Sequence, residues 1–247
     1  FVIKSAFIAV EAVALLVTVL LLISVPRSGS TDVSSSVREQ LVILKDRRII
    51  LVLVMKAFGM AATYVFYVYV TPILEDSVGL SVWMVSLVLF FYGGATIVSN
   101  LGSGSLAQRY GLGKLPLMFA LQAVVLALLG LSLASGNTLL CIINVVLTGV
   151  FIYHMNAPLQ SYLLQVSAKD YPRALTLASA VMPTSSDIGI ATGSFMGGMV
   201  ATNLGFAWSG PVGALLAVVS VVAAFMILQP ESRMGGSLRS RLRRSKR

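Results

Sequence analysis

A short basic stretch, Asn100-Leu-Gly-Ser-Gly-Ser-Leu-Ala-Gln-Arg-Tyr-Gly-Leu-Gly-Lys114, separates two long apolar runs of this chain. Glycines at positions Gly102 and Gly104 permit two helix ends to approach closely, because they carry no side chain. Gly111 and Gly113 suit the left-handed backbone of a turn that follows a helix. The stretch therefore predicts a tight loop that joins two antiparallel helices.

The composition places those helices in a membrane. Of the 247 residues, 57% are hydrophobic and 11% are charged, and the mean hydropathy is +0.91. Soluble proteins carry about 25% charged residues. The apolar residues come in runs of about 20, the length that crosses about 30 Å of hydrocarbon as a helix. The only cysteine, Cys141, lies inside such a run and excludes a disulfide within the chain.

The fold class predicted from these runs is an all-α integral membrane protein with seven transmembrane helices. The expected spans are residues 6–25, 49–70, 82–101, 115–134, 139–166, 174–201 and 206–228. Pro158 is expected to kink the fifth span or to end it early. The predicted organisation is a first helix within 1–25, a polar connector at 26–48, a six-helix unit at 49–229 and a basic tail at 230–247.

The distribution of positive charge predicts the orientation. The net charge is +9, and nearly all of the 18 lysines and arginines fall in alternate loops that share one side of the membrane, in the connector or in the tail. Lysine and arginine are enriched on the cytoplasmic side of membrane proteins. We therefore expect a protein of the cell membrane with a cytoplasmic C-terminus, and an outward loop containing Glu75 and Asp76. The tail is expected to contact anionic membrane lipid, with no nucleic acid as partner.

The opening stretch resembles a family signature. Gly104-x-Leu-Ala-x-Arg-x-Gly111 is similar to the loop motif Gly-x-Leu-Ala-Asp-Arg-x-Gly-Arg-Arg/Lys of major facilitator superfamily transporters. Gln108 replaces the acidic residue of that motif and Leu112 replaces its first base, as in the degenerate C-terminal copy of the loop. The resemblance implies a conformational loop formed by Gly104, Arg109, Gly111 and Lys114.

Three further segments extend this resemblance over residues 49–228. The segments 66–81, 157–166 and 185–194 look like the seventh, tenth and eleventh spans of arabinose-efflux-permease-like drug and sugar exporters, which have an asparagine at the position of Asp187. The first span would then be the sixth helix of the family, the last of the N-terminal half. The six later spans would form the C-terminal half, and the expected partner is the missing N-terminal half.

Asp187 is the first candidate for chemistry. It lies about 14 residues into the sixth span, or about 20 Å along a helix that rises 1.5 Å per residue. An ionisable group at that depth is costly, so it is expected to face a cavity or a partner. Asp187 is a candidate for proton coupling or substrate contact. The alternative is a structural carboxyl group bonded to Ser185 or Thr184.

Four other polar side chains are candidates for the same role. Lys56 either extends its amine to the cytoplasmic interface or lines the cavity. His154, the only histidine, has two interpretations: it is a proton relay or a hydrogen-bond donor to substrate, or its hydrogen bonds are satisfied within the fold. Asn156 lies near His154 in the cytoplasmic half of the fifth span and could share a broad polar face with Asn144. Tyr67 lies in a group of aromatic residues that would line a substrate cavity or sit in an interfacial belt.

Three glycines at four-residue spacing mark one face of the sixth span. Gly189, Gly193 and Gly197 form two overlapping Gly-xxx-Gly units. Small residues at this spacing allow close helix packing in membranes. The alternative interpretation is a smooth surface along which helices slide during transport.

The sequence indicates no enzyme. It has no cysteine and histidine spacing for a metal, no Gly-x-Ser-x-Gly motif and no phosphate-binding loop, so we expect no metal and no cofactor. The resemblance instead implies a secondary transporter, an antiporter for proton-coupled efflux of drugs, sugars or other small molecules. Two alternatives remain: a complete seven-helix receptor or sensor, and a non-catalytic membrane subunit that pairs with a separate N-terminal half.

Overall fold

The computed structural model describes residues 2–24 and 40–229, and all regular structure in them is helical. The chain divides into two compact units, Phe1–Ser34 and Ser35–Arg247. The first unit contains helix α1 (Val2–Ser24). Residues 25–39, which include most of the predicted connector, and the predicted basic tail, residues 230–247, lie outside the described residues.

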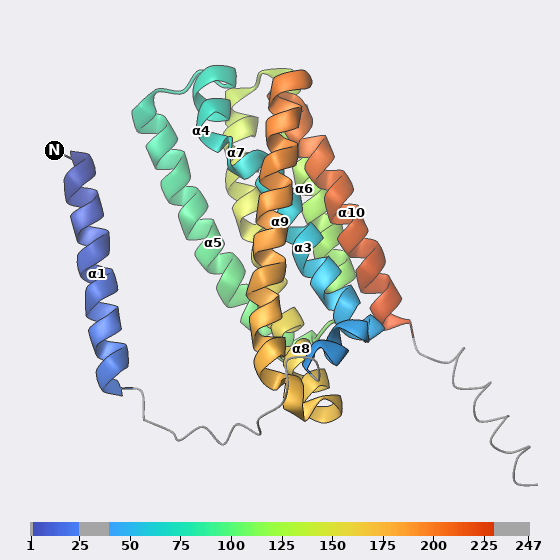
Figure 1. Ribbon diagram of the computed structural model, residues 1–247. Coiled ribbons are helices and arrows are strands. Elements are labelled where there is room, and N and C mark those ends of the chain that lie inside the picture. The colour runs from blue at the N-terminus through green and yellow to red at the C-terminus, as the bar shows by residue number, and fades with distance from the viewer. Residues whose placement is uncertain (1, 25–39, 230–247) are drawn as a thin grey trace, which may run out of the picture. The chain divides into compact units, whose positions relative to one another are not determined.

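The second unit contains the rest of the helices (Figure 1). They are η1 (Leu41–Lys45), α3 (Arg47–Tyr67), α4 (Val70–Pro72), η2 (Ile73–Ser77), α5 (Val82–Tyr110), α6 (Leu115–Ser135), α7 (Thr138–Phe151), α8 (Asn156–Asp170), η3 (Pro172–Ala174), α9 (Leu175–Asn203), η4 (Phe206–Trp208) and α10 (Ser209–Leu228).

Five helical stretches of the described chain are long and apolar enough to cross a membrane. They are Arg47–Tyr67, Val82–Tyr110, Leu115–Ser135, Thr138–Asp170 and Phe206–Leu228. Helix α9 has 29 residues, but its serine, threonine and aspartate content makes it less apolar. The described apolar part of α1 is the shorter Glu11–Ser24. The all-helical membrane class is thus confirmed, whereas the count of seven spans stays a prediction.

Helix α3 is the centre of the second unit, because it packs against both α9 and α10 (Figure 1). Its backbone carbonyls also receive hydrogen bonds from neighbouring helices. Ser185 of α9 donates to the carbonyl of Leu53 at 2.7 Å, and Ser220 of α10 donates to that of Met55 at 3.2 Å. The central helix is therefore held through its backbone as well as through side-chain packing.

The predicted glycine face of α9 lies directly against α3. A Cβ atom added at Gly189, Gly193 or Gly197 would collide with the carbonyl oxygen of Ala57, Ala61 or Val65, respectively. Each glycine therefore meets one turn of α3. This geometry supports the close-packing interpretation. The contact lies within one unit, and sliding along it stays a prediction.

The predicted loop 100–114 is much shorter in the structure. Helix α5 continues to Tyr110, and only four residues separate it from α6. Gly102 and Gly104 are helical, and a Cβ atom at either would have no neighbour within 4 Å among the described residues. The close approach predicted for them was wrong, because helix ends meet only past Tyr110. Gly111, with φ of 53°, has the predicted left-handed backbone, whereas Gly113 does not.

The predicted fifth span is interrupted. Helix α7 ends at Phe151 and α8 begins at Asn156. The early end that we expected is present, but it comes before Pro158, which lies in the first turn of α8. Proline is tolerated in the first turn of a helix because the N–H that it lacks has no partner there. The break places four residues, 152–155, between two nearly continuous helices.

An ionic cluster joins the start of α3 to the end of α8. Asp46 caps α3 by accepting a hydrogen bond from the Arg48 N–H at 2.8 Å. The Arg48 guanidinium forms ion pairs with Asp46 at 2.7 Å and with Asp170 at 2.6 Å. The Tyr171 hydroxyl donates to Asp46 at 3.1 Å. The hydrogen bond from Arg48 is the main reason why the pKa of Asp46 is lowered from 3.8.

Candidate functional site

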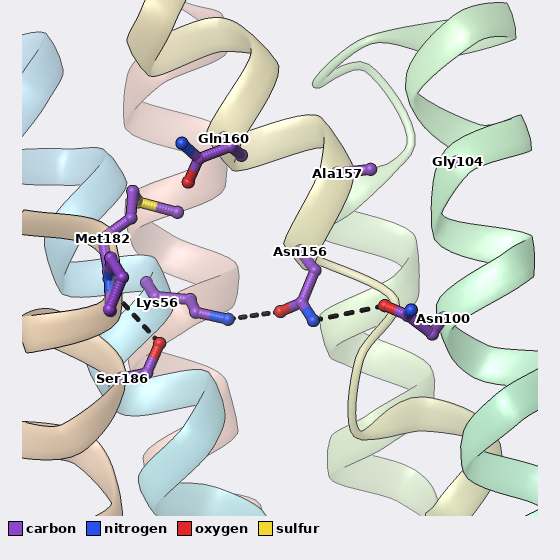
Figure 2. Close-up of a pocket in the computed structure, with 9 residues that line it drawn as sticks. Lys56, Asn100, Gly104, Asn156, Ala157, Gln160, Met182 and Ser186 are labelled. Atoms are coloured by element: carbon purple, nitrogen blue, oxygen red, sulfur yellow. Dashed lines mark hydrogen bonds between the residues drawn. The ribbon is translucent and has the colours of Figure 1, made fainter. Parts of the chain in front are cut away.

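The main cavity of the second unit lies among α3, α5, α8 and α9, and its volume is about 420 Å³. Figure 2 shows its wall of polar side chains from separate helices. It is lined by Lys56, Asn100, Gly104, Asn156, Ala157, Gln160, Met182, Pro183 and Ser186. One lysine, three side-chain amides and a hydroxyl thus face a common space inside a helical membrane unit.

Lys56 is the charged group of this cavity. Its side chain is buried, with 6% of its surface exposed, and its amine donates a hydrogen bond to Oδ1 of Asn156. Nδ2 of Asn156 in turn donates to Oδ1 of Asn100 at 3.4 Å. This chain of contacts crosses from α3 through α8 to α5 (Figure 2). Of the two interpretations of Lys56, the structure supports a position in the cavity wall.

The break between α7 and α8 is held by two serines of α5. Ser99 accepts a hydrogen bond from the backbone N–H of Tyr153 at 2.9 Å. One turn later, Ser103 accepts from the N–H of Ala157 at 2.8 Å. Backbone groups released by a helix break need such partners inside a membrane, because no water satisfies them. The two serines therefore stabilise the irregular backbone that positions Asn156.

His154 lies in the break but lines neither cavity described here. It is 5% exposed, and its Nδ1 donates to the carbonyl of Phe151 at 2.5 Å. Its ring meets the edge of Phe119 with centroids 4.9 Å apart and planes at 76°. Within the part of the chain that the structure describes, Nε2 is buried without a hydrogen-bond partner. Only one of the two ring nitrogens is thus satisfied within the fold, and a proton-relay role stays a prediction.

A second, smaller cavity of about 180 Å³ is mostly aromatic. It is lined by Tyr64, Tyr67, Leu89, Tyr92, Gly93, Thr96, Ile152 and Tyr153. The rings of Tyr67 and Tyr92 are stacked, with centroids 5.0 Å apart and planes at 20°, and the ring of Tyr64 meets Tyr67 edge-on at 5.4 Å. Tyr67 is therefore placed at a cavity, as its substrate-lining interpretation requires.

Asp187 is exposed on α9 and follows the cavity residue Ser186. Within the described residues it makes no hydrogen bond or ion pair. Thr184 donates its hydroxyl to the carbonyl of Ala180, and Ser185 donates to Leu53. The alternative in which these hydroxyls hold the Asp187 carboxylate was wrong, because each is used by a backbone carbonyl. Asp187 remains a candidate without a structural partner in the described part of the chain.

The four residues of the predicted conformational loop are separated in the structure. Gly104 lines the main cavity, whereas Arg109 is exposed in the last turn of α5. Gly111 ends that helix. Lys114 precedes α6 and places its amine 5.6 Å from the centre of the Tyr110 ring. A shared conformational role of these residues stays a prediction.

Asn100 and Ser186 are cavity residues that the sequence analysis did not identify. Asn100 lies near the end of the predicted span 82–101, but it was not identified as a site residue, although the spacing from Asn100 to Gly104 is that of one face of a helix. Ser186 is one of many small polar residues in its span, so nothing in the local pattern distinguishes it. Both residues are recognised only because the fold brings α5 and α9 to the same cavity.

Comparison with known proteins agrees with this architecture. The family model of the Major Facilitator Superfamily matches residues 1–175. The chain is 29% identical over 223 residues to the "Uncharacterized MFS-type transporter YtbD" of Bacillus subtilis, covering 89% of this chain and 55% of that protein. It is 25% identical over 232 residues to the "Inner membrane transport protein YdhP" of Escherichia coli K12, covering 93% of this chain and 58% of that protein.

The chain thus spans little more than half the length of these curated relatives. With its apolar helices and this match, the chain is an integral membrane protein that belongs to the Major Facilitator Superfamily.

Proposed function

We propose that this chain is the C-terminal portion of a secondary active transporter that exports small molecules in exchange for protons. The observation that carries the proposal is the cavity among α3, α5, α8 and α9, with the buried amine of Lys56 in its wall. Ionisable groups inside membrane helices are costly and mark the paths of substrates and ions. The family membership and the names of the two relatives given above support transport over the receptor interpretation.

The interrupted helix supports the same proposal. Substrate sites of transporters are commonly formed by discontinuous helices near the middle of the membrane. Here the break at residues 152–155 lies between the two cavities: Tyr153 lines the aromatic one, and Asn156 lines the polar one. In the proposed mechanism, a preceding helical half completes the cavity, and rocking of the two halves opens it alternately to each side.

Asp187 is the proposed proton-coupling residue. Its carboxylate is exposed, has no partner among the described residues, and follows Ser186 of the cavity wall. A carboxyl group in that position is free to bind a proton from one side and to release it after the cavity reorients. The coupling ion and the outward direction are part of this proposal.

The test is proton-coupled efflux by the full-length transporter in vesicles. A drug and sugar panel is added to acidified inside-out vesicles, and substrate-dependent proton movement is followed with a pH-sensitive dye. Asp187→Asn is expected to abolish the pH-driven component, whereas Asp76→Asn, in the exposed turn η2, is expected to leave it unchanged. Unaltered coupling in Asp187→Asn would remove this residue from the proton path.

The 247-residue chain is tested in parallel and is expected not to transport by itself. Transport by this chain alone would contradict the need for a second half. Transport restored by co-expression with a separate N-terminal half would identify the chain as one of two subunits.

A further inference from the structure

The main cavity contains a positive charge with no negative partner in the described chain. Among residues 40–229, no carboxylate forms an ion pair with Lys56. Its partner is the neutral amide of Asn156. A buried charge is costly unless an opposite charge and hydrogen bonds satisfy it. The amine has further donor capacity, because an ammonium group carries three N–H bonds.

The start of α8 adds to the positive potential. Asn156 and Ala157 are its first two residues, and both line the cavity. The N-terminus of a helix carries a partial positive charge of about half an elementary charge. The N–H of Ala157 already donates to Ser103, so it is not available to a ligand. The helix therefore contributes positive potential at the cavity, and the hydrogen-bond donors for a ligand come from Lys56 and the side-chain amides. An anionic group is the chemistry that this combination favours.

The aromatic cavity shares helices α3 and α5 with the main cavity. Tyr64 follows Lys56 by eight residues of α3, which corresponds to about 12 Å along the axis. Both cavities border the break between α7 and α8, through Ile152 and Tyr153 on one side and through Asn156 on the other. Aromatic side chains provide a large apolar surface for a flat apolar group. One small amphipathic molecule would therefore find its charged and apolar partners in neighbouring spaces.

We propose that the molecule bound by this transporter half is an aromatic carboxylate, with its carboxylate on Lys56 and its ring on the tyrosines of the second cavity. This inference rests on the proposed function, because it assigns a substrate class to the same cavity. It makes Lys56 a binding residue that selects for charge, and it makes Asn156 a positioning residue that holds the amine.

The experiment compares two probes that have the same ring system and nearly the same shape, one anionic and one neutral. Binding of 2-naphthoate and of its neutral analogue 2-naphthamide is measured at equilibrium with the full-length transporter in nanodiscs. The carboxylate is expected to bind at least about 10-fold more tightly, a factor of the size that a charge-assisted hydrogen bond provides. Lys56→Met, which keeps the length and removes the charge, is expected to bind both probes equally.

Asn156→Asp is the second variant. It gives Lys56 an internal carboxylate at the position of the present amide oxygen, so it is expected to remove the preference for naphthoate while preserving the fold. Lys169→Met, an exposed lysine near the end of α8, is the matched control and is expected to keep the full preference. A melting temperature equal to that of the unaltered transporter shows that each variant is folded.

Equal binding of the two probes by the unaltered transporter would overturn the proposal. So would a preference that persists in Lys56→Met, because the charge would then be recognised elsewhere. Selective binding of naphthoate without efflux in vesicles would contradict the proposed function but support the proposed binding site. Efflux without selective binding would support the proposed function and contradict the binding site, so the two failures are distinguishable.

Discussion

The contact between α9 and α3 makes Gly193→Ala the most direct test of this fold. A Cβ atom at Gly193 would lie 2.5 Å from the carbonyl oxygen of Ala61, 2.8 Å from its Cα and 3.0 Å from its carbonyl carbon. Ordinary contacts of a Cβ atom lie at 3.4–4 Å. All three obstructing atoms are backbone atoms of the central helix, so no side chain can rotate away. Helix α9 must move instead.

The expected cost follows from this geometry. Overpacking a tight interface costs about 1–3 kcal/mol, and a collision with backbone falls at the upper end of that range. Alanine recovers about 1 kcal/mol of helix propensity relative to glycine. The net loss is therefore about 2 kcal/mol, which lowers the melting temperature of a chain of this size by about 4–8 °C.

The control is Gly94→Ala in α5, where a Cβ atom would have no neighbour within 4 Å in the part of the chain that the structure describes. This change retains the propensity gain without a collision, so its melting temperature is expected to stay the same or to rise. Unfolding is followed in detergent with a maleimide dye that reacts with Cys141, the only cysteine of this chain, which is 1% exposed. Equal melting temperatures for the two variants would refute the inferred helix contact.

Two further predictions concern hydrogen bonds. Ser99→Ala removes the acceptor for the Tyr153 N–H in the helix break and is expected to cost about 1–3 kcal/mol, because it leaves a part-buried donor unsatisfied. Ser86→Ala, at an exposed site that is also on α5, should change thermal stability by less than about 0.5 kcal/mol. The pKa of Asp46 is lowered in the folded protein. Its carboxylate therefore stabilises the fold at pH values above the unfolded-state pKa near 3.8, and this stabilisation is lost as the pH falls through the lower pKa of the folded state. Because the pair of Arg48 and Asp46 is partly exposed, Arg48→Met is expected to cost no more than about 1 kcal/mol near neutral pH. The melting temperature of this variant is expected to fall less on acidification below about pH 4 than that of the unaltered protein. An equal fall in melting temperature for the two proteins would contradict this assignment.

Local pattern alone predicted some parts of the site and missed others. The spacing of Gly189, Gly193 and Gly197 placed them on one face of a helix, since that periodicity is intrinsic to helix geometry. The predicted loop around Gly104 was longer than the real one, because glycine lowers helix propensity without preventing a helix. The surroundings of α5 leave room at that residue, which no local pattern reveals.

The membrane class and the candidate residues were available from the sequence. The length and apolarity of a run determine whether a helix can cross a bilayer, and a charge such as Lys56 is conspicuous in a run of that kind. The family was also accessible, because a motif such as that around Arg109 is local.

The tertiary structure alone decided what these residues contact. Lys56 and Asn156 are 100 residues apart, and Asn100 lies 56 residues before Asn156. Whether a polar side chain of a membrane helix faces lipid, a neighbouring helix or a cavity depends on the rotation of each helix and on the neighbours it packs against. That arrangement follows from the fit of whole helix surfaces, here the glycine face of α9 on α3, and no local run of residues encodes it.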